Sequence, residues 1–268
     1  MSIIWHNGDW LEDSQAIYSV HDRLRLGECV FATILADQGR LVRWGLHIEK
    51  LVHNLGVMKL SLPYAPEDLL VAGQDLLKKN GLSEGRAAFN IFVSGGPGGN
   101  GIRPPETRAE QVSMRALPCP SAFPPVNAII AKSVRRNEGS PLSQIKCGNY
   151  GENILAVYEA QEQGANEAIL LNNQGRVTCA SVASVFAVLG GALYTPPLSD
   201  GAQGGVTRRT LIERYGAVEK SLSSEDLFQS EGIYLANSLR GVVPVVSLDG
   251  RACPAPSLSI PADFHLHE

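Results

Sequence analysis

A proline-rich segment divides the chain into two parts. Residues 117–125 read Leu-Pro-Cys-Pro-Ser-Ala-Phe-Pro-Pro and hold four prolines. Proline lacks the backbone N–H that helix interiors and central strands need, so this segment is typical of a stiff connection between compact units. We therefore predict an α+β domain over residues 1–117, a linker over 118–126 and a second domain over 127–268.

The amino-acid composition argues against a nucleic-acid-binding, membrane-spanning or metal-binding protein. The chain has 268 residues, of which 44% are hydrophobic, enough to bury a large core. Its net charge is −4 and it has no basic block, so nucleic acid is not an expected partner. The first residues lack a signal-peptide pattern, and no apolar run reaches the roughly 18 residues of a membrane span. The five cysteines are scattered without metal-ligand spacing. We therefore expect reduced thiols in the cytoplasm, with no membrane association and no bound metal.

Local patterns predict strands and two helices in the first part. The dipeptide Asn7-Gly8 predicts a hairpin between residues 2–5 and 9–11. Hydrophobic residues at helical spacing predict one helix over 47–59, and a second helix is predicted over 66–79. The other apolar runs predict strands over 29–35, 40–44, 87–94 and 111–117.

A glycine-rich loop separates two of these strands. Residues 95–105 read Gly-Gly-Pro-Gly-Gly-Asn-Gly-Ile-Arg-Pro-Pro, which is long for a hairpin connection. Two interpretations stay open. The loop is either a mobile surface excursion or a flap that covers a pocket.

The second part alternates strands with helices. A helix is predicted over 151–164, with Ile154, Leu155 and Tyr158 at helical spacing. Apolar runs bounded by turn residues predict strands over 168–171, from 176 onward, and over 185–189, 192–195, 233–237 and 242–248.

A further helix begins near Thr207 or Arg208, directly after Gly204-Gly205. The free N–H groups and the dipole at such a helix start favour a phosphate group. Upstream, Lys146 lies between the turn-forming Ser140-Pro141 and Gly148, where its amine can point into a cleft. Most lysines are solvated surface charges. Together, however, a lysine able to form a Schiff base and a phosphate-binding helix start suggest pyridoxal phosphate as cofactor.

Several motifs, in their order and spacing, resemble the fold-type IV pyridoxal phosphate enzymes, the class IV aminotransferase family. That family includes branched-chain and D-amino-acid aminotransferases and 4-amino-4-deoxychorismate lyases. The resemblance implies an α/β protein with a smaller N-terminal α+β domain, a larger C-terminal pseudo-barrel domain and a homodimeric assembly. The motifs are Lys146-Cys-Gly-Asn-Tyr150, Gly164-Ala-Asn-Glu-Ala168, Gly175-Arg-Val-Thr178, Leu193-Tyr-Thr-Pro196 and Gly205-Val-Thr-Arg208.

The resemblance assigns the cofactor contacts. Lys146 matches the lysine that binds pyridoxal phosphate covalently, and Tyr150 matches a tyrosine whose phenol contacts the ring oxygen. Lys50 replaces the arginine that closes the phosphate site, which keeps the charge but loses the two-pronged hydrogen bonding. The remaining phosphate contacts implied are Val206, Thr207 and Ser238.

Two positions depart from the family pattern. Cys179 stands where the family has a glutamate that keeps the pyridine nitrogen protonated, and Ser184 stands where asparagine is usual. A neutral thiol cannot hold that proton, so the ring becomes a weaker electron sink. The chain is therefore either an enzyme with altered chemistry or a paralogue that binds pyridoxal phosphate without the ancestral reaction.

Within the family, two features favour 4-amino-4-deoxychorismate lyase, which releases pyruvate and the folate precursor 4-aminobenzoate. Thr33 matches a lyase threonine that assists proton transfer, and the run around Asn237 and Arg240 resembles a lyase motif for substrate binding. Gly95 and Asn100 replace arginines of a lyase loop, which weakens the match. Formation of an aromatic ring would offset a weak electron sink. The alternatives are a class IV amino acid aminotransferase and the catalytically impaired paralogue.

Overall fold

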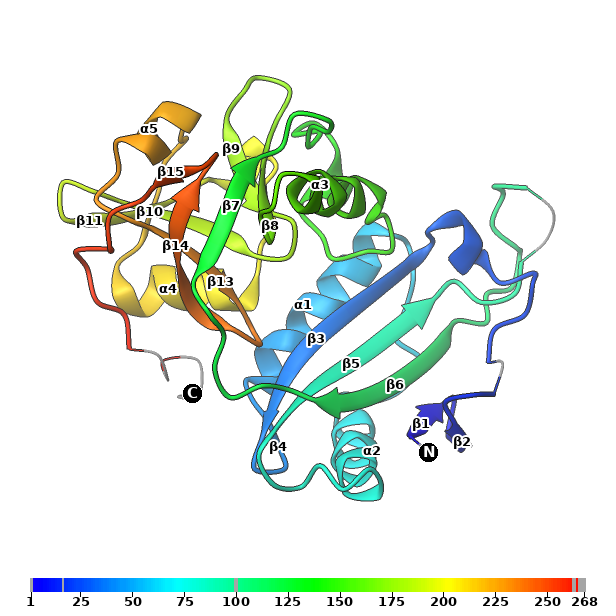
Figure 1. Ribbon diagram of the computed structural model, residues 1–268. Helices are drawn as coiled ribbons and strands as arrows, with labels where there is room; N and C mark the ends of the chain where they lie inside the picture. The colour runs from blue at the N-terminus through cyan, green and yellow to red at the C-terminus, as the bar shows by residue number, and fades with distance from the viewer. Residues whose placement is uncertain (1, 16, 99–100, 262–263, 265–268) are drawn as a thin grey trace. The chain divides into compact units, whose positions relative to one another are not determined.

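The computed structural model describes residues 2–15, 17–98, 101–261 and 264, and they form two compact units (Figure 1). The first unit runs to Ser121 and also takes in Lys146–Gly148, while the second begins at Ala122 and holds the rest of the described chain. Residues 146–148 join the first unit because they pair with one of its strands. The domain boundaries at residues 117 and 126 stay a prediction.

The first unit is built on an antiparallel sheet, six-stranded within the described residues, in the order β2-β1-β6-β5-β3-β4. The hairpin predicted at Asn7-Gly8 is confirmed, since both residues have positive φ angles of 50° and 101°. The strands are β1 (Ile3–His6), β2 (Asp9–Glu12), β3 (Cys29–Asp37), β4 (Arg40–Leu41), β5 (Arg86–Ser94) and β6 (Gln111–Pro118).

Helices α1 (Trp44–Val57) and α2 (Pro66–Lys79) cover one face of this sheet. Phe89 of β5 is fully buried there. The Trp44 ring meets Phe89 edge-on at 6.3 Å, and a Cβ on Gly73 of α2 would lie 3.1 Å from the same ring. The strand predicted over 40–44 is shorter than expected, because Arg43 takes a left-handed φ of 52° and starts α1.

The second unit holds a mixed sheet, nine-stranded in the part that the structure describes. Its main path runs β12-β11-β10-β13-β14-β7-β8-β9 and curls back, so that the Ala180 N–H donates to the Ala183 carbonyl at 2.8 Å and joins β9 to β10. This closure agrees with the predicted pseudo-barrel. The strands are β7 (Val126–Ile130), β8 (Glu167–Leu171), β9 (Val177–Ala180), β10 (Ser184–Leu189), β11 (Ala192–Thr195), β12 (Val218–Glu219), β13 (Ile233–Asn237), β14 (Gly241–Leu248) and β15 (Arg251–Ala252).

Helix α3 (Gly151–Glu162) packs against β8 through small side chains. Its large apolar residues Ile154, Leu155 and Tyr158 are 51%, 54% and 57% exposed, whereas Ala156 and Ala160 are buried. Small side chains let the helix approach the sheet closely, where Ala156 and Ala160 share a core cluster with alanines of the neighbouring strand and loop. The helix predicted over 151–164 is therefore confirmed, and its large apolar side chains lie on the exposed side.

The other helical segments are short. The N-terminus of α5 carries a capping box between Ser223 and Asp226. Neither β7 nor α5 was predicted from the sequence. In the described residues, no helix is both long and apolar enough to cross a membrane. The helices of this unit are α3 (Gly151–Glu162), α4 (Val206–Tyr215) and α5 (Ser224–Phe228), and short 3₁₀ turns lie at Arg23–Leu26 in the first unit and at Pro141–Ser143 and Leu198–Asp200 in the second.

Candidate active site

Lys146 lies beside the first half of β3 in the first unit, whereas β4 pairs with the end of that strand. Its carbonyl accepts from the Phe31 N–H at 3.1 Å, and the Gly148 N–H donates to the Cys29 carbonyl at 3.0 Å. A Cβ on Gly148 would lie 2.1 Å from Cys29 Sγ, so only glycine allows this approach. The pairing directs the half-buried Lys146 side chain over Phe31, with Nζ 4.3 Å from the centroid of the ring.

Positive charge gathers around His47 of α1. This histidine is 7% exposed, and its pKa falls to about 3, first because of burial and then because of the charges on Arg43, Lys50 and Lys146. The imidazole is therefore neutral near pH 7. Three cations around one neutral histidine form a local positive potential that favours an anionic group. The structure thus brings Lys50 and Lys146 into one electrostatic environment and adds Arg43, which sequence reasoning missed.

Thr33 lies on the sheet face opposite to the one that α1 and α2 cover. Along β3, Phe31 and Thr33 are half-buried while Ala32 and Ile34 between and beside them are buried. Thr33 stands opposite Asn90 of β5, whose Nδ2 donates to Thr33 Oγ1 at 2.8 Å. The threonine hydroxyl is therefore the next side chain beyond the Phe31 ring on the face that carries Lys146.

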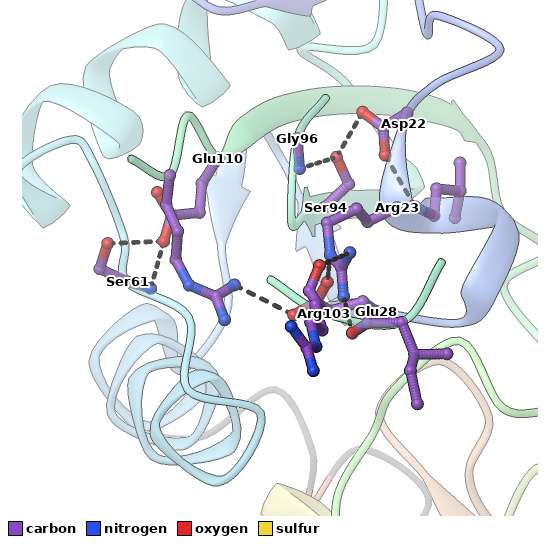
Figure 2. A network of polar contacts seen from close by, with 11 residues as sticks. Asp22, Arg23, Glu28, Ser61, Ser94, Gly96, Arg103 and Glu110 are labelled. Atoms are coloured by element: carbon purple, nitrogen blue, oxygen red, sulfur yellow. Dashed lines mark hydrogen bonds and ion pairs between the residues drawn. The ribbon is translucent and has the colours of Figure 1, made fainter. Parts of the chain in front are cut away.

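The glycine-rich loop is held by the buried Arg23 (Figure 2). Arg23 Nη1 donates to the Arg103 carbonyl at 3.0 Å and Nη2 to the Ile102 carbonyl at 3.0 Å, while Nε pairs with Glu28. Glu28 also binds Arg108 Nη1 at 3.0 Å. This network fixes the second half of the loop to the turn before β3.

The first half of the same loop is also anchored (Figure 2). Ser94 Oγ donates to Asp22 Oδ2 at 3.0 Å and accepts from the Gly96 N–H at 3.3 Å. Asp22 in turn forms an isolated bridge with Pro97. Asn100, named above as a departure from the lyase loop, lies outside the described residues. The flap interpretation stays a prediction.

In the second unit, helix α4 begins with the predicted phosphate contacts. Gly205 is the N-cap, Val206 and Thr207 follow in the first turn, and that turn holds no acidic residue. Thr207 Oγ1 lies 3.5 Å from Ser238 Oγ, so the fold brings together two hydroxyls that are 31 positions apart. Paired hydroxyls at a helix start suit an anion.

The loop before α4 is tied to the segment that ends at Ile145. Gln203 Nε2 donates to the Ile145 carbonyl at 3.0 Å, and the Gly204 N–H donates to the Gln144 carbonyl at 3.3 Å. Tyr150 is the N-cap of α3 and is half-buried. Its contact with a cofactor oxygen stays a prediction.

Cys179 is buried on β9, where burial raises the pKa of its thiol and the charge on Arg136 opposes that rise. Arg136 is itself 7% exposed, binds the Ser143 carbonyl and lies 3.5 Å from Asn153 Oδ1. Its Nε has no hydrogen-bond partner among the residues that the structure describes. The charge on Glu167 adds to the rise in the pKa of the thiol, so both a cation and a carboxylate act on Cys179, while position 179 itself supplies a thiol in place of the implied glutamate.

A buried carboxylate does lie on the neighbouring strand. Glu167 of β8 is 1% exposed, accepts from the Ser181 N–H at 3.1 Å and from the Ser181 hydroxyl, and forms an ion pair with Arg240. Sequence reasoning quoted Glu167 inside the motif Gly164–Ala168 but gave it no role. Its one signal was an acidic residue at the head of an otherwise apolar strand.

The two substrate-side candidates both have structural partners. Asn237 Oδ1 accepts from the Leu239 and Arg240 N–H groups at 3.0 and 2.8 Å, and its Nδ2 donates to the Val182 carbonyl at 3.1 Å. Arg240 is paired with Glu167. Asn237 therefore shapes the turn after β13, and its contact with substrate stays a prediction, as does that of Arg240.

These groups fit pyridoxal phosphate in part. In the first unit, Lys146 offers the amine that the aldehyde needs, and the cations near it suit an anionic group. In the second unit, the hydroxyls at the start of α4 suit a phosphate group. Cys179 does not suit a protonated pyridine nitrogen. Within the described residues, no cluster of three or more histidine, cysteine or acidic side chains could hold a metal ion.

Comparison with known proteins agrees with this chemistry. The family model for amino-transferase class IV matches residues 29–248. A putative branched-chain-amino-acid aminotransferase of Methanocaldococcus jannaschii is 29% identical over 92% of this chain and 88% of its own length. The aminodeoxychorismate lyase of Bacillus subtilis is 26% identical over 92% of this chain and 87% of its own.

Solved structures show the same fold. A branched-chain aminotransferase of Thermoproteus uzoniensis with norvaline superposes with a TM-score of 0.87 at 26% identity, covering 94% of this chain and 89% of its own. A putative 4-amino-4-deoxychorismate lyase of Legionella pneumophila gives 0.84 at 27% identity, covering 90% of each chain. The chain therefore belongs to the class IV aminotransferases, a family of pyridoxal phosphate-dependent enzymes with the fold-type IV architecture.

Proposed function

We propose that this protein is a 4-amino-4-deoxychorismate lyase that releases pyruvate and the folate precursor 4-aminobenzoate. The observation that carries the proposal is the Thr33 hydroxyl, which follows Phe31 on the face of β3 over which the Lys146 amine lies. Residues two apart on a strand share a face and lie about 7 Å apart. An amine and a hydroxyl at this spacing suit a reaction that removes one proton and delivers another.

The residues have distinct roles in this reaction. Lys146 binds the cofactor and then removes the proton from the ring carbon that bears the substrate nitrogen. The bond from the ring to the enolpyruvyl oxygen breaks, the leaving oxygen takes a proton with the help of Thr33, and the released enol becomes pyruvate. Pyridoxal phosphate, when bound, supplies the electron sink for this proton removal. Lys50, Val206, Thr207 and Ser238 would hold its phosphate, and Tyr150 would hold its ring oxygen.

Cys179 supports a lyase over a transaminase. A buried neutral thiol leaves the electron sink weak, because it carries no negative charge to hold the pyridine nitrogen protonated. Loss of the enolpyruvyl group produces an aromatic ring. Because this product is strongly stabilised, the reaction needs less stabilisation of negative charge by the cofactor ring. Transamination has no comparable driving force. The substrate carboxylates are assigned to Asn237 and Arg240, with Arg240 leaving part of its pairing with Glu167.

The second candidate is an amino acid aminotransferase. The Methanocaldococcus jannaschii relative favours it, since that putative branched-chain enzyme is 29% identical, against 26% for the Bacillus subtilis lyase. A catalytically impaired paralogue is the remaining alternative, and Cys179 is its main support.

We also propose a homodimer in the cytoplasm. Helix α3 exposes Ile154, Leu155 and Tyr158 on one surface, and apolar clusters of this kind mark protein–protein contacts. All five cysteines are free, as in a reducing compartment.

The test is a product assay on the purified protein with Lys146→Ala beside it. Aminodeoxychorismate should yield pyruvate and 4-aminobenzoate in equal amounts, and the variant should yield neither. Amino transfer to 2-oxoglutarate without pyruvate release would contradict the lyase proposal and support the aminotransferase. An absorbance band that borohydride abolishes would show that the native protein binds pyridoxal phosphate. If that protein turned over no amino donor, it would be the catalytically impaired paralogue.

A further inference from the structure

Asn90 holds the Thr33 hydroxyl in one orientation. The two residues face each other across β3 and β5, both half-buried, with Asn90 Nδ2 donating to Thr33 Oγ1 at 2.8 Å. A threonine hydroxyl has one hydrogen to donate and two lone pairs with which to accept. Because one lone pair is occupied by the asparagine, the hydroxyl hydrogen points away from Asn90.

The side chains beside Thr33 on β3 indicate which group the hydroxyl hydrogen can reach. On this face of β3 the neighbour of Thr33 toward the start of the strand is Phe31, whose ring lies under Lys146 Nζ at 4.3 Å. The neighbouring side chain on the other side is the buried Leu35, which cannot accept a hydrogen bond. Neither Phe31 nor Leu35 carries a side-chain oxygen or nitrogen that could accept, so we infer that the hydroxyl hydrogen faces the substrate that Lys146 would handle.

We propose that Asn90 is a positioning residue for the lyase reaction, which orients the Thr33 hydroxyl as a hydrogen-bond donor to the leaving enolpyruvyl oxygen. This inference rests on the proposed function. It assigns a role to a residue that touches no reacting atom and acts only through Thr33. The competing explanation is a cross-strand hydrogen bond that stabilises the sheet and nothing more.

Asn90→Asp separates these explanations. Aspartate has the same shape, but as a carboxylate it can only accept, so the Thr33 hydroxyl turns toward it and no longer faces the substrate. We expect kcat to fall by about 10- to 100-fold with KM within about threefold, as when a positioned proton donor is lost. Asn90→Ala removes the donor without adding charge and should lower kcat in the same direction.

The decisive experiment is a double-mutant cycle on pyruvate release with Thr33→Val, Asn90→Asp and the double variant. If Asn90 acts through Thr33, Asn90→Asp changes kcat less than about twofold once Thr33 is valine. Thr33→Ser, which keeps a hydroxyl, should retain most of the activity and should restore the sensitivity to Asn90→Asp.

Asn80→Asp is the matched control. Asn80 Nδ2 donates to the Ile3 carbonyl at 2.8 Å and ties α2 to β1, so this variant loses a structural donor of the same kind. It should lower the unfolding temperature and leave kcat unchanged. Multiplicative losses in the cycle, or an Asn90→Asp enzyme with native kcat, would overturn the inference alone. A native protein that releases no pyruvate would overturn the proposed function and this inference with it.

Discussion

Arg240 Nη1 lies 3.3 Å from Glu167 Oε2, and the carboxylate is buried while the arginine side chain is 28% exposed. The guanidinium carbon also lies 5.9 Å from the centroid of the Phe123 ring. A residue expected at the substrate is thus anchored on a buried acid. Because only the carboxylate is fully buried, loss of the arginine should destabilise the fold more than loss of the acid.

We predict that Arg240→Met destabilises the protein more than Glu167→Gln. Removal of the arginine leaves a buried carboxylate whose remaining donors are the Ala168 N–H and the N–H and hydroxyl of Ser181, at a cost of about 3 kcal/mol. Removal of the acid leaves an arginine that can turn toward solvent, at a cost of roughly 1 kcal/mol. Urea unfolding of the two variants checks the order, and the reverse order would show that the pair is not governed by burial.

Gly96 and Gly101 provide a test of the anchored loop. Both have positive φ angles, of 72° and 81°, but a Cβ on Gly96 would lie 1.9 Å from the Ala109 carbonyl oxygen, whereas Gly101 has no atom within 4 Å. Gly101→Ala should cost about 1 kcal/mol from backbone strain alone. Gly96→Ala should cost at least about 1 kcal/mol more. Equal unfolding temperatures would contradict the close approach at Gly96.

His47 should make the protein sensitive to acid. Its pKa is about 3 in the folded protein and near 6.5 when unfolded. Between these values the unfolded chain binds more protons, so stability is fully present above pH 6.5 and is lost as the pH falls toward 3. The loss from this residue between pH 7 and pH 5 is about 2 kcal/mol. His47→Gln should remove that part of the pH dependence, as urea unfolding at both pH values would show, and an unchanged slope would mean that His47 titrates normally.

In the proposed chemistry, the side chain at position 179 sets how well the cofactor ring stabilises negative charge. Cys179→Glu places a carboxylate near Arg136, whose buried Nε has no partner among the described residues. We expect this variant to raise kcat for amino transfer by about tenfold or more, because a protonated pyridine nitrogen stabilises negative charge on the substrate. Cys179→Gln has similar volume without the charge and should give no gain. Equal rates for both variants would contradict the assignment of Cys179 to the ring nitrogen.

The exposed surface of α3 carries the proposed dimer contact. Leu155→Arg places a charge among Ile154, Leu155 and Tyr158 and should give monomers, measured by light scattering after gel filtration. Gln163→Arg at the C-cap of the same helix makes the same change in charge at an exposed position on another side of the helix, and it should leave the dimer intact. Dimers from both variants would place the contact elsewhere.

Local signals in the sequence determined the elements and the family. The hairpin at Asn7-Gly8 and the helix over Pro66–Lys79 were predicted because turn residues, caps and periodic spacing act within a few residues. The motifs around Lys146 and Thr207 determined the family because they need only order and spacing. Such signals depend on backbone preferences that each short segment carries by itself.

Only the tertiary structure decided which residues meet. Glu167 and Arg240 are 73 positions apart, and Thr33 and Asn90 are 57 apart, so no local pattern joins them. The inner face of α3 was likewise decided by packing: the close approach of the sheet selected Ala156 and Ala160 over larger apolar side chains. Residues 146–148 pair with β3 because Gly148 has no side chain to meet Cys29. Which residues contact one another depends on the room left between packed elements and on the polar groups that packing leaves without a hydrogen bond. Both are fixed only once the chain has packed.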